Sequence, residues 1–331
     1  MGPSLLSHNL LSPSRRSHAR RIRRLAPARA LRYQSRVGSP AGKFAHDDRH
    51  GIVAAAAAFV LWGIVPVFWK ALAHVDPAEC LAHRFLWSAV LAGAVAGWAR
   101  RETLGTLIRD GRALPALALS GALIAVNWLT FIWAVQQHRM LDTSLGYFIN
   151  PLVSIALGAL FLGEPVLGLR RLAVALAAVA VAYETMALGR LPWVSLVLAL
   201  TFGLYGYVRK TIAVGALEGL AIETALMAPF ALAYLCWRAA AGTTTFLHAG
   251  PGTDLLVLAT GPVTTLPLVL FAFGARRIRL STLGFLQYIA PSMTLVLAVF
   301  VYAEAYTHLQ VVTFGLVWSA LALVSVDALR G

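Results

Sequence analysis

The chain is dominated by long apolar blocks separated by short charged connections. A helix needs about 20 mostly apolar residues, each rising about 1.5 Å, to cross roughly 30 Å of hydrocarbon. Blocks of this kind lie near 51–72, 80–99, 113–135, 142–162, 170–187, 192–208, 219–240, 254–275, 281–302 and 309–327. Because backbone polar groups cannot stay unpaired in lipid, the blocks predict an all-α membrane protein with ten transmembrane helices.

The composition argues against a water-soluble protein. Of the 331 residues, 59% are hydrophobic and 13% are charged, whereas soluble domains carry about 25% charged residues. The two cysteines, Cys80 and Cys236, are too few for a disulfide framework or a metal site. The sequence has no phosphate-binding loop, zinc-ligand spacing or common hydrolase motif. We therefore expect a protein that is not an enzyme and uses no metal or cofactor.

The first fifty residues differ from the rest. They carry ten arginines and one lysine against two acids, and no apolar run long enough for a signal peptide. We interpret residues 1–50 as a basic, disordered cytoplasmic tail. Two alternatives are a mitochondrial presequence and a true translation start near Val37. The net charge of +14 indicates contact with an anionic membrane leaflet and no nucleic acid.

The basic residues also predict the orientation. Connections on the N-terminal side hold 12 Lys and Arg residues without the tail, and those on the opposite side hold four, Lys70, Arg139, Arg190 and Arg238. Because Lys and Arg are enriched in cytoplasmic loops, we expect both termini in the cytoplasm.

The two halves of the chain resemble each other at an offset of 140 residues. The matching positions are Trp62-Gly63 with Phe202-Gly203, Trp69-Lys70 with Arg209-Lys210, Pro151 with Pro291, and Glu164 with Glu304. Each unit, 51–188 and 189–331, has five predicted helices. Because five is odd, the second unit enters the membrane from the opposite face, as in the inverted repeats of transporters. The alternative is a duplication that only made a stable bundle.

Pro151 and Pro291 each fall near the middle of a predicted span. A proline there frees the carbonyl four residues earlier, at Tyr147 and Gln287. Interruptions in corresponding helices are typical of a central binding site. A simple packing kink is the alternative.

Several motifs follow one another in a fixed order. They are Leu61-Trp62-Gly63 with Pro66, Phe68, Trp69 and Lys70; Glu79 to Arg84 with Trp87-Ser88; Asn127-Trp128 with Phe131 to Val135; Ser144 to Leu152; and Ser281 to Pro291. Together they resemble the RarD group of EamA-type permeases, in the drug/metabolite transporter superfamily, over residues 51–327. The resemblance implies two inverted EamA repeats, a bacterial plasma-membrane location and secondary transport. The extension before Gly51 lies outside the family pattern.

Charged residues in the second span are candidates for the site. Charges inside hydrocarbon cost about 2.5–3.5 kcal/mol each, so they normally face a cavity or a partner. Glu79 and His83 share a helix face, and Arg84 follows directly. They predict a proton-linked or anion-binding cluster in the outer vestibule, or alternatively an interfacial ion pair with Arg84 reaching the headgroups.

Other candidates are polar or aromatic. Glu223 corresponds to His83 at the repeat offset. Glu184 is expected to be a solvated charge near a helix end, and Gly93 and Gly97 are expected to pack against another helix. The complete set of substrate-binding or coupling candidates is Trp62, Glu79, His83, Arg84, Asn127, Tyr147, Asn150, Pro151, Glu223, Gln287, Tyr288 and Pro291.

The leading functional hypothesis is a secondary permease that moves a small metabolite or drug-like solute by alternating access. Its partners would be the solute, the lipid bilayer and a coupling ion such as a proton. A membrane-embedded enzyme acting on lipid or isoprenoid substrates is the runner-up, although its acids and histidines should cluster at one interface. A non-transporting assembly or sensor subunit is the third hypothesis.

Overall fold

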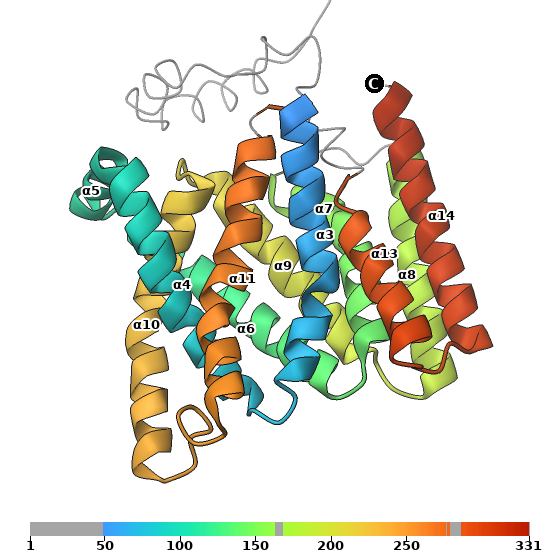
Figure 1. The fold of residues 1–331 in the computed structure, drawn as a ribbon. Coiled ribbons are helices and arrows are strands. Elements are labelled where there is room, and N and C mark those ends of the chain that lie inside the picture. The colour runs from blue at the N-terminus through green and yellow to red at the C-terminus, as the bar shows by residue number, and fades with distance from the viewer. Residues whose placement is uncertain (1–48, 163–167, 276, 279–285, 331) are drawn as a thin grey trace, which may run out of the picture. The chain divides into compact units, whose positions relative to one another are not determined.

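A computed structural model describes residues 49–162, 168–275, 277–278 and 286–330. Within these ranges the regular structure is helical and contains no strand (Figure 1). The helices are α3 (Arg49–Ala71), α4 (Pro77–Ala99), α5 (Arg101–Asp110), α6 (Leu114–Gln136), α7 (Met140–Leu162), α8 (Gly168–Leu188), α9 (Trp193–Thr211), α10 (Ala216–Ala240), α11 (Pro251–Ala275), α13 (Ile289–Val296), the π-helical turn η2 (Leu297–Val301) and α14 (His308–Arg330). The predicted spans agree with these helices to within three residues, except the ninth, whose described helix begins at Ile289. Glu164 and most of the tail lie outside the described residues.

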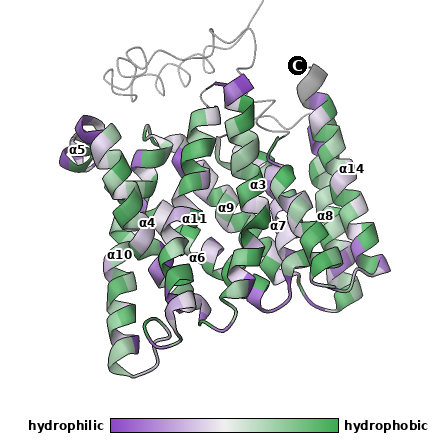
Figure 2. Cartoon of the chain, in the orientation of Figure 1, coloured by the Kyte–Doolittle hydropathy of each residue, from purple (hydrophilic) through white to green (hydrophobic). Residues whose placement is uncertain are grey.

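Eight of the described helices are long and apolar enough to cross a membrane. They are α3, α4, α6, α7, α8, α10, α11 and α14. Two shorter apolar helices, α9 and the α13–η2 segment, run among them. Apolar residues cover the bodies of the helices, and hydrophilic residues gather at their ends and on α5 (Figure 2). This distribution matches a membrane protein that exposes apolar side chains to lipid.

Helix α5 is an element that the sequence analysis placed in a charged connection. Its ten residues are too short to cross a bilayer, and none of them is buried. Glu102 lies in the first turn and Arg109 in the last turn, which suits the helix dipole. Gly111 ends the helix in the left-handed conformation, at a φ of 64°. The basic residues of this connection are therefore displayed on a short surface helix.

The packing of the helices repeats when the two predicted units are exchanged. Helix α7 packs on α9 as α13 packs on α3, and α6 packs on α9 as α11 packs on α3. Likewise α11 packs on α4 as α10 packs on α6. The pairs α4–α10 and α8–α14, both extensive, map onto themselves. The neighbours are those of a bundle with an internal two-fold relation.

Close approaches at two glycines follow the same relation. A Cβ atom built on Gly63 in α3 would lie 2.8 Å from the Cβ of Met293 in α13. One built on Gly203 in α9 would lie 3.0 Å from the Cγ1 of Val153 in α7. The offset of 140 relates both residues of one contact to those of the other.

A second pair of glycines behaves in the same way. A Cβ built on Gly121 in α6 would lie 3.5 Å from the Cγ of Met227 in α10. One built on Gly261 in α11 would lie 2.8 Å from the Cβ of Trp87 in α4. Again the offset of 140 relates both residues. Small residues thus allow four close helix contacts, in two symmetric pairs.

The expected packing role of Gly93 and Gly97 is wrong. A Cβ atom at either position would have no neighbouring atom within 4 Å in the described chain. The sequence spacing of these glycines permits close approach, but α4 turns this face away from its neighbours. Spacing alone therefore does not identify the packed face of a helix.

The two prolines differ in their surroundings. Pro151 lies inside α7, which continues through it from Met140 to Leu162. Pro291, which was expected inside a helix, lies instead in the first turn of α13. There its missing N–H removes no helical hydrogen bond. The ninth segment departs from α-geometry further along, where η2 ends with Glu304 N donating to Ala298 O at 2.8 Å.

Replacing Gly261 with alanine should destabilise the bundle, because the new methyl group overlaps the Trp87 backbone. Overpacking of this kind costs about 1–3 kcal/mol. Gly93→Ala is the matched control, because alanine is favoured over glycine in helices by at most about 1 kcal/mol and has free space there. Thermal unfolding in detergent should show a lower midpoint for G261A and an unchanged or higher midpoint for G93A. Equal midpoints would contradict the packing described.

Candidate functional site

Glu79 is held by the segment that follows α10. Its Oε1 accepts hydrogen bonds from Thr244 Oγ1 at 3.0 Å, Thr245 N at 2.8 Å and Phe246 N at 3.1 Å. Its Oε2 accepts from Arg238 at 3.1 Å. The side chain is fully buried. Glu79 thus fixes the connection between α10 and α11 onto the start of α4.

His83 lies one turn further along α4 and is 4% exposed. Its ring is stacked parallel to Trp87, with centroids 6.5 Å apart, and lies 4.7 Å from the ring of Phe246. Neither ring nitrogen has a hydrogen-bond partner in the described part of the chain. Although His83 and Glu79 share a helix face, they are not hydrogen-bonded to each other.

Arg84 is a buried cation with aromatic neighbours. It is 8% exposed, and its guanidinium carbon lies 3.6 Å from the ring centre of Trp128 and 5.4 Å from that of Trp69. Its Nε has no hydrogen-bond partner, and the guanidinium forms no ion pair with any carboxylate of the described residues. Seven residues from the start of α4, it lies about 10 Å along the helix.

Asn127 joins three helices beside this cation. Its Nδ2 donates to Leu198 O and to Thr201 Oγ1, each at 3.0 Å, both in α9. Its Oδ1 accepts from the Tyr147 hydroxyl of α7 at 3.2 Å. Tyr147 in turn lies close enough to Arg84 for their charges to interact. Helices α4, α6, α7 and α9 therefore meet in one aromatic and polar cluster.

Glu223 lies in a separate network. Its Oε1 accepts from Ser120 Oγ at 2.6 Å, and its Oε2 accepts from the Tyr205 hydroxyl at 3.4 Å. Arg209 forms an ion pair with it at 3.6 Å. The carboxylate is 1% exposed and is paired within the chain. It links α6, α9 and α10.

The remaining candidates are distributed over helix contacts. Trp62 packs against Phe59 and Phe271, and Tyr288 stacks on Phe148 with centroids 6.3 Å apart. Gln287 lies in the turn before α13, and the buried Oδ1 of Asn150 has no hydrogen-bond partner among the described residues. Pro151 lies one residue further along α7.

Helices α7 and α13 are joined by a hydrogen bond at Pro291. Ser144 Oγ donates to the Pro291 carbonyl at 2.8 Å. The twelve candidates therefore do not form one pocket. Arg84, Asn127 and Tyr147 come together, with His83 beside Arg84 in the chain, and Glu223 lies apart.

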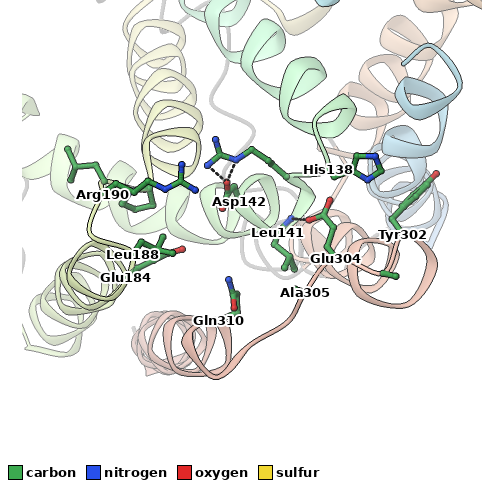
Figure 3. Close-up of a pocket in the computed structure, with 14 residues that line it drawn as sticks. His138, Leu141, Asp142, Glu184, Leu188, Arg190, Tyr302, Glu304, Ala305 and Gln310 are labelled. Atoms are coloured by element: carbon green, nitrogen blue, oxygen red, sulfur yellow. Dashed lines mark hydrogen bonds and ion pairs between the residues drawn. The ribbon is translucent and has the colours of Figure 1, made fainter. Parts of the chain in front are cut away.

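A pocket of about 400 Å³ opens at the end of the bundle where α6 ends and α7 begins. It is lined by His138, Arg139, Leu141, Asp142, Glu184, Leu188, Arg190, Leu191, Pro192, Tyr302, Ala303, Glu304, Ala305 and Gln310 (Figure 3). Glu304 accepts from the backbone N–H groups of Met140 and Leu141, at 2.8 and 2.9 Å, and so caps α7. The sequence analysis did not propose this vestibule, although its charged residues flank apolar spans.

Glu184 in this pocket corrects an expectation. The predicted solvated charge is only 3% exposed, and its Oε2 has no partner among the described residues. It lies on α8, which packs along α14, and it lines the vestibule (Figure 3). The prediction failed because distance from a helix end does not show which face of the helix is covered.

Comparison with known proteins identifies the family. The EamA-like transporter family matches residues 49–184. Protein RarD of Escherichia coli is 44% identical over 290 residues, which cover 86% of this chain and 97% of that protein. The chain belongs to the RarD group of EamA-type permeases.

Other relatives of this RarD-type permease agree. An uncharacterized transporter of Vibrio cholerae is 44% identical over 86% of this chain and 94% of its own length. The chloramphenicol-sensitive protein RarD of Pseudomonas aeruginosa is 30% identical over 85% and 95%. A crystal structure with 18% identity shares the fold, with a TM-score of 0.54 over 85% of this chain and 99% of the other. The protein is thus a multi-pass transporter of the bacterial inner membrane, in the drug/metabolite superfamily.

Glu79→Ala should destabilise the permease strongly, because it leaves Arg238 and three further donors without their acceptor. Removing one partner of a buried ion pair costs about 3–5 kcal/mol. Glu102→Ala on the exposed helix α5 is the control. The expected result is a large drop in the unfolding temperature for E79A and little change for E102A. A stable E79A variant would show that this carboxylate does not anchor the connection.

Proposed function

We propose that the protein is a secondary transporter whose ten spans form two inverted units, 51–188 and 189–331, and that it moves a small solute by alternating access. The observation that carries this proposal is the symmetry of the contacts. Glycine approaches related by 140 residues occur at corresponding helix pairs of both units. Two units of opposite orientation supply two equivalent openings, which alternating access requires.

The proposed orientation has both termini in the cytoplasm. The start of α3 and the end of α14 lie at the same end of the helical unit (Figure 1). The excess of basic residues belongs to that side, 12 against four. The vestibule with Glu184 and Glu304 would then open to the outside.

The solute site is proposed at the cluster of Arg84, Trp128, Asn127 and Tyr147. It combines aromatic walls with a few polar groups, as small-molecule sites commonly do. It lies about 10 Å inside the outer ends of the helices. His83 stands beside it, whereas Glu79 and Glu223 are satisfied within the chain and serve its structure.

The contact of α7 with α13 is the proposed place where the units move against each other. Pro151 and Pro291 lie on these helices, together with Asn150 and the adjoining Gln287 and Tyr288. Trp62 lies near it, because α3 packs against α13 at Gly63. A proton or another ion is proposed to drive the cycle.

Orientation is tested by cysteine labelling in a Cys80→Ser, Cys236→Ser background. Ala249→Cys follows α10 on the proposed outer side, and Arg109→Cys lies on α5 on the inner side. Both positions are exposed. A membrane-impermeant maleimide should label A249C in intact cells and R109C only after lysis. The reverse pattern would overturn the orientation.

Transport is tested with purified protein in liposomes, screened against small metabolites with and without a pH gradient. A transported solute should show counterflow, in which preloaded unlabelled solute drives uptake of labelled solute. Arg84→Ala should abolish the flux with expression intact, and Arg112→Ala, a surface arginine paired with Asp110, should retain it. Unimpaired flux in R84A would remove Arg84 from the site. Lipid turnover without any solute flux would favour the enzyme instead.

A further inference from the structure

We infer that the transported solute is a small organic anion, which places its carboxylate on Arg84 and its flat apolar body against the indole rings beside it. The inference rests on the transport function proposed above and adds the class of solute. It depends on the charge balance of the buried arginines and on the polar atoms that surround Arg84.

Three other arginines with little exposed side chain each have a carboxylate partner. Arg139 is 21% exposed and pairs with Asp142 at 2.6 Å. Arg209 is 13% exposed and pairs with Glu223, and Arg238 is 16% exposed and pairs with Glu79. Arg84 is more buried than any of these and has no such partner among the described residues. One positive charge within the helical bundle is thus left uncompensated.

The indole rings compensate that charge only in part. A cation above the face of tryptophan is attracted by the ring, and Trp128 lies at stacking distance from the guanidinium. This attraction is smaller than the cost of removing a guanidinium from water. Its planar fork of donors also remains free to bind a carboxylate through two parallel hydrogen bonds. An anion is therefore the ligand that the site lacks.

The unpaired polar atoms at this cation are donors. The Nε of Arg84 and the indole Nε1 of Trp69 are buried and have no hydrogen-bond partner in the described chain. The acceptors nearby are already used, because Asn127 Oδ1 accepts from Tyr147 and Thr201 Oγ1 accepts from Asn127. A ligand that offers oxygen acceptors fits this arrangement, and a cationic ligand does not.

The rings of Trp128 and Trp69 set the shape of the solute. Both face the guanidinium, and Phe85 lies 5.4 Å from Trp128. A planar apolar group next to a carboxylate would lie against such rings. Benzoate has this combination, and benzamide has the same shape without the charge.

The test measures saturable binding of radiolabelled benzoate to the purified full-length protein in nanodiscs. Unlabelled benzoate should compete at least tenfold better than benzamide, and sodium chloride should compete poorly. Arg84→Gln should weaken binding at least tenfold, Arg84→Lys less, and Arg112→Gln should leave it unchanged. Unfolding temperature and size-exclusion profile establish that each variant is folded, and R84K with the benzamide comparison decides if R84Q is not.

The inference is overturned if benzoate shows no saturable binding, if benzamide or chloride competes equally, or if folded R84Q binds like the wild type. Its failure is distinct from failure of the transport proposal. Counterflow of a neutral solute without benzoate binding would reject the anion and retain the transporter. Benzoate binding that depends on Arg84, without flux of any solute, would retain the anion site and reject transport.

Discussion

Every polar group inside this bundle must find its partner within the chain, because lipid offers none. The backbone meets this requirement by forming helices. The charged side chains meet it by pairing between helices that are distant in sequence, as Glu79 does with Arg238 and Glu223 with Arg209. These pairs hold the outer connection and the inner half of the bundle in place. The same requirement makes a buried charge without a partner informative.

The helices approach one another where the sequence provides glycine and where topology brings those glycines to an interface. Gly63 and Gly203 allow α3 and α9 to contact α13 and α7, and Gly121 and Gly261 do the same for a second set. Because the two sets correspond at a constant offset, one packing solution serves both halves. Related interfaces of this kind let one half tilt against the other at a similar cost in either direction.

Arg84 stands apart from the paired charges. Its position between aromatic rings, next to the Asn127 and Tyr147 network, places a cation where four helices converge. The vestibule at the outer end is lined by Glu184, Arg190 and Glu304, so charged groups of both signs surround the opening. A solute entering from that side would pass from a mixed-charge opening to a cationic centre.

The sequence by itself determined the class of fold, the position of most helices and the family, because block length, hydropathy and motif order are local properties. It also indicated Arg84, Asn127 and Tyr147 as a group, because polar residues within apolar spans are rare and costly. Only the tertiary structure decided which residues meet. It buried Glu184, left Gly93 and Gly97 without a neighbour, paired Glu79 with Arg238 rather than His83, and placed Pro291 in the first turn of α13. The rotation of each helix about its axis decides these outcomes, and it follows from packing over the whole bundle.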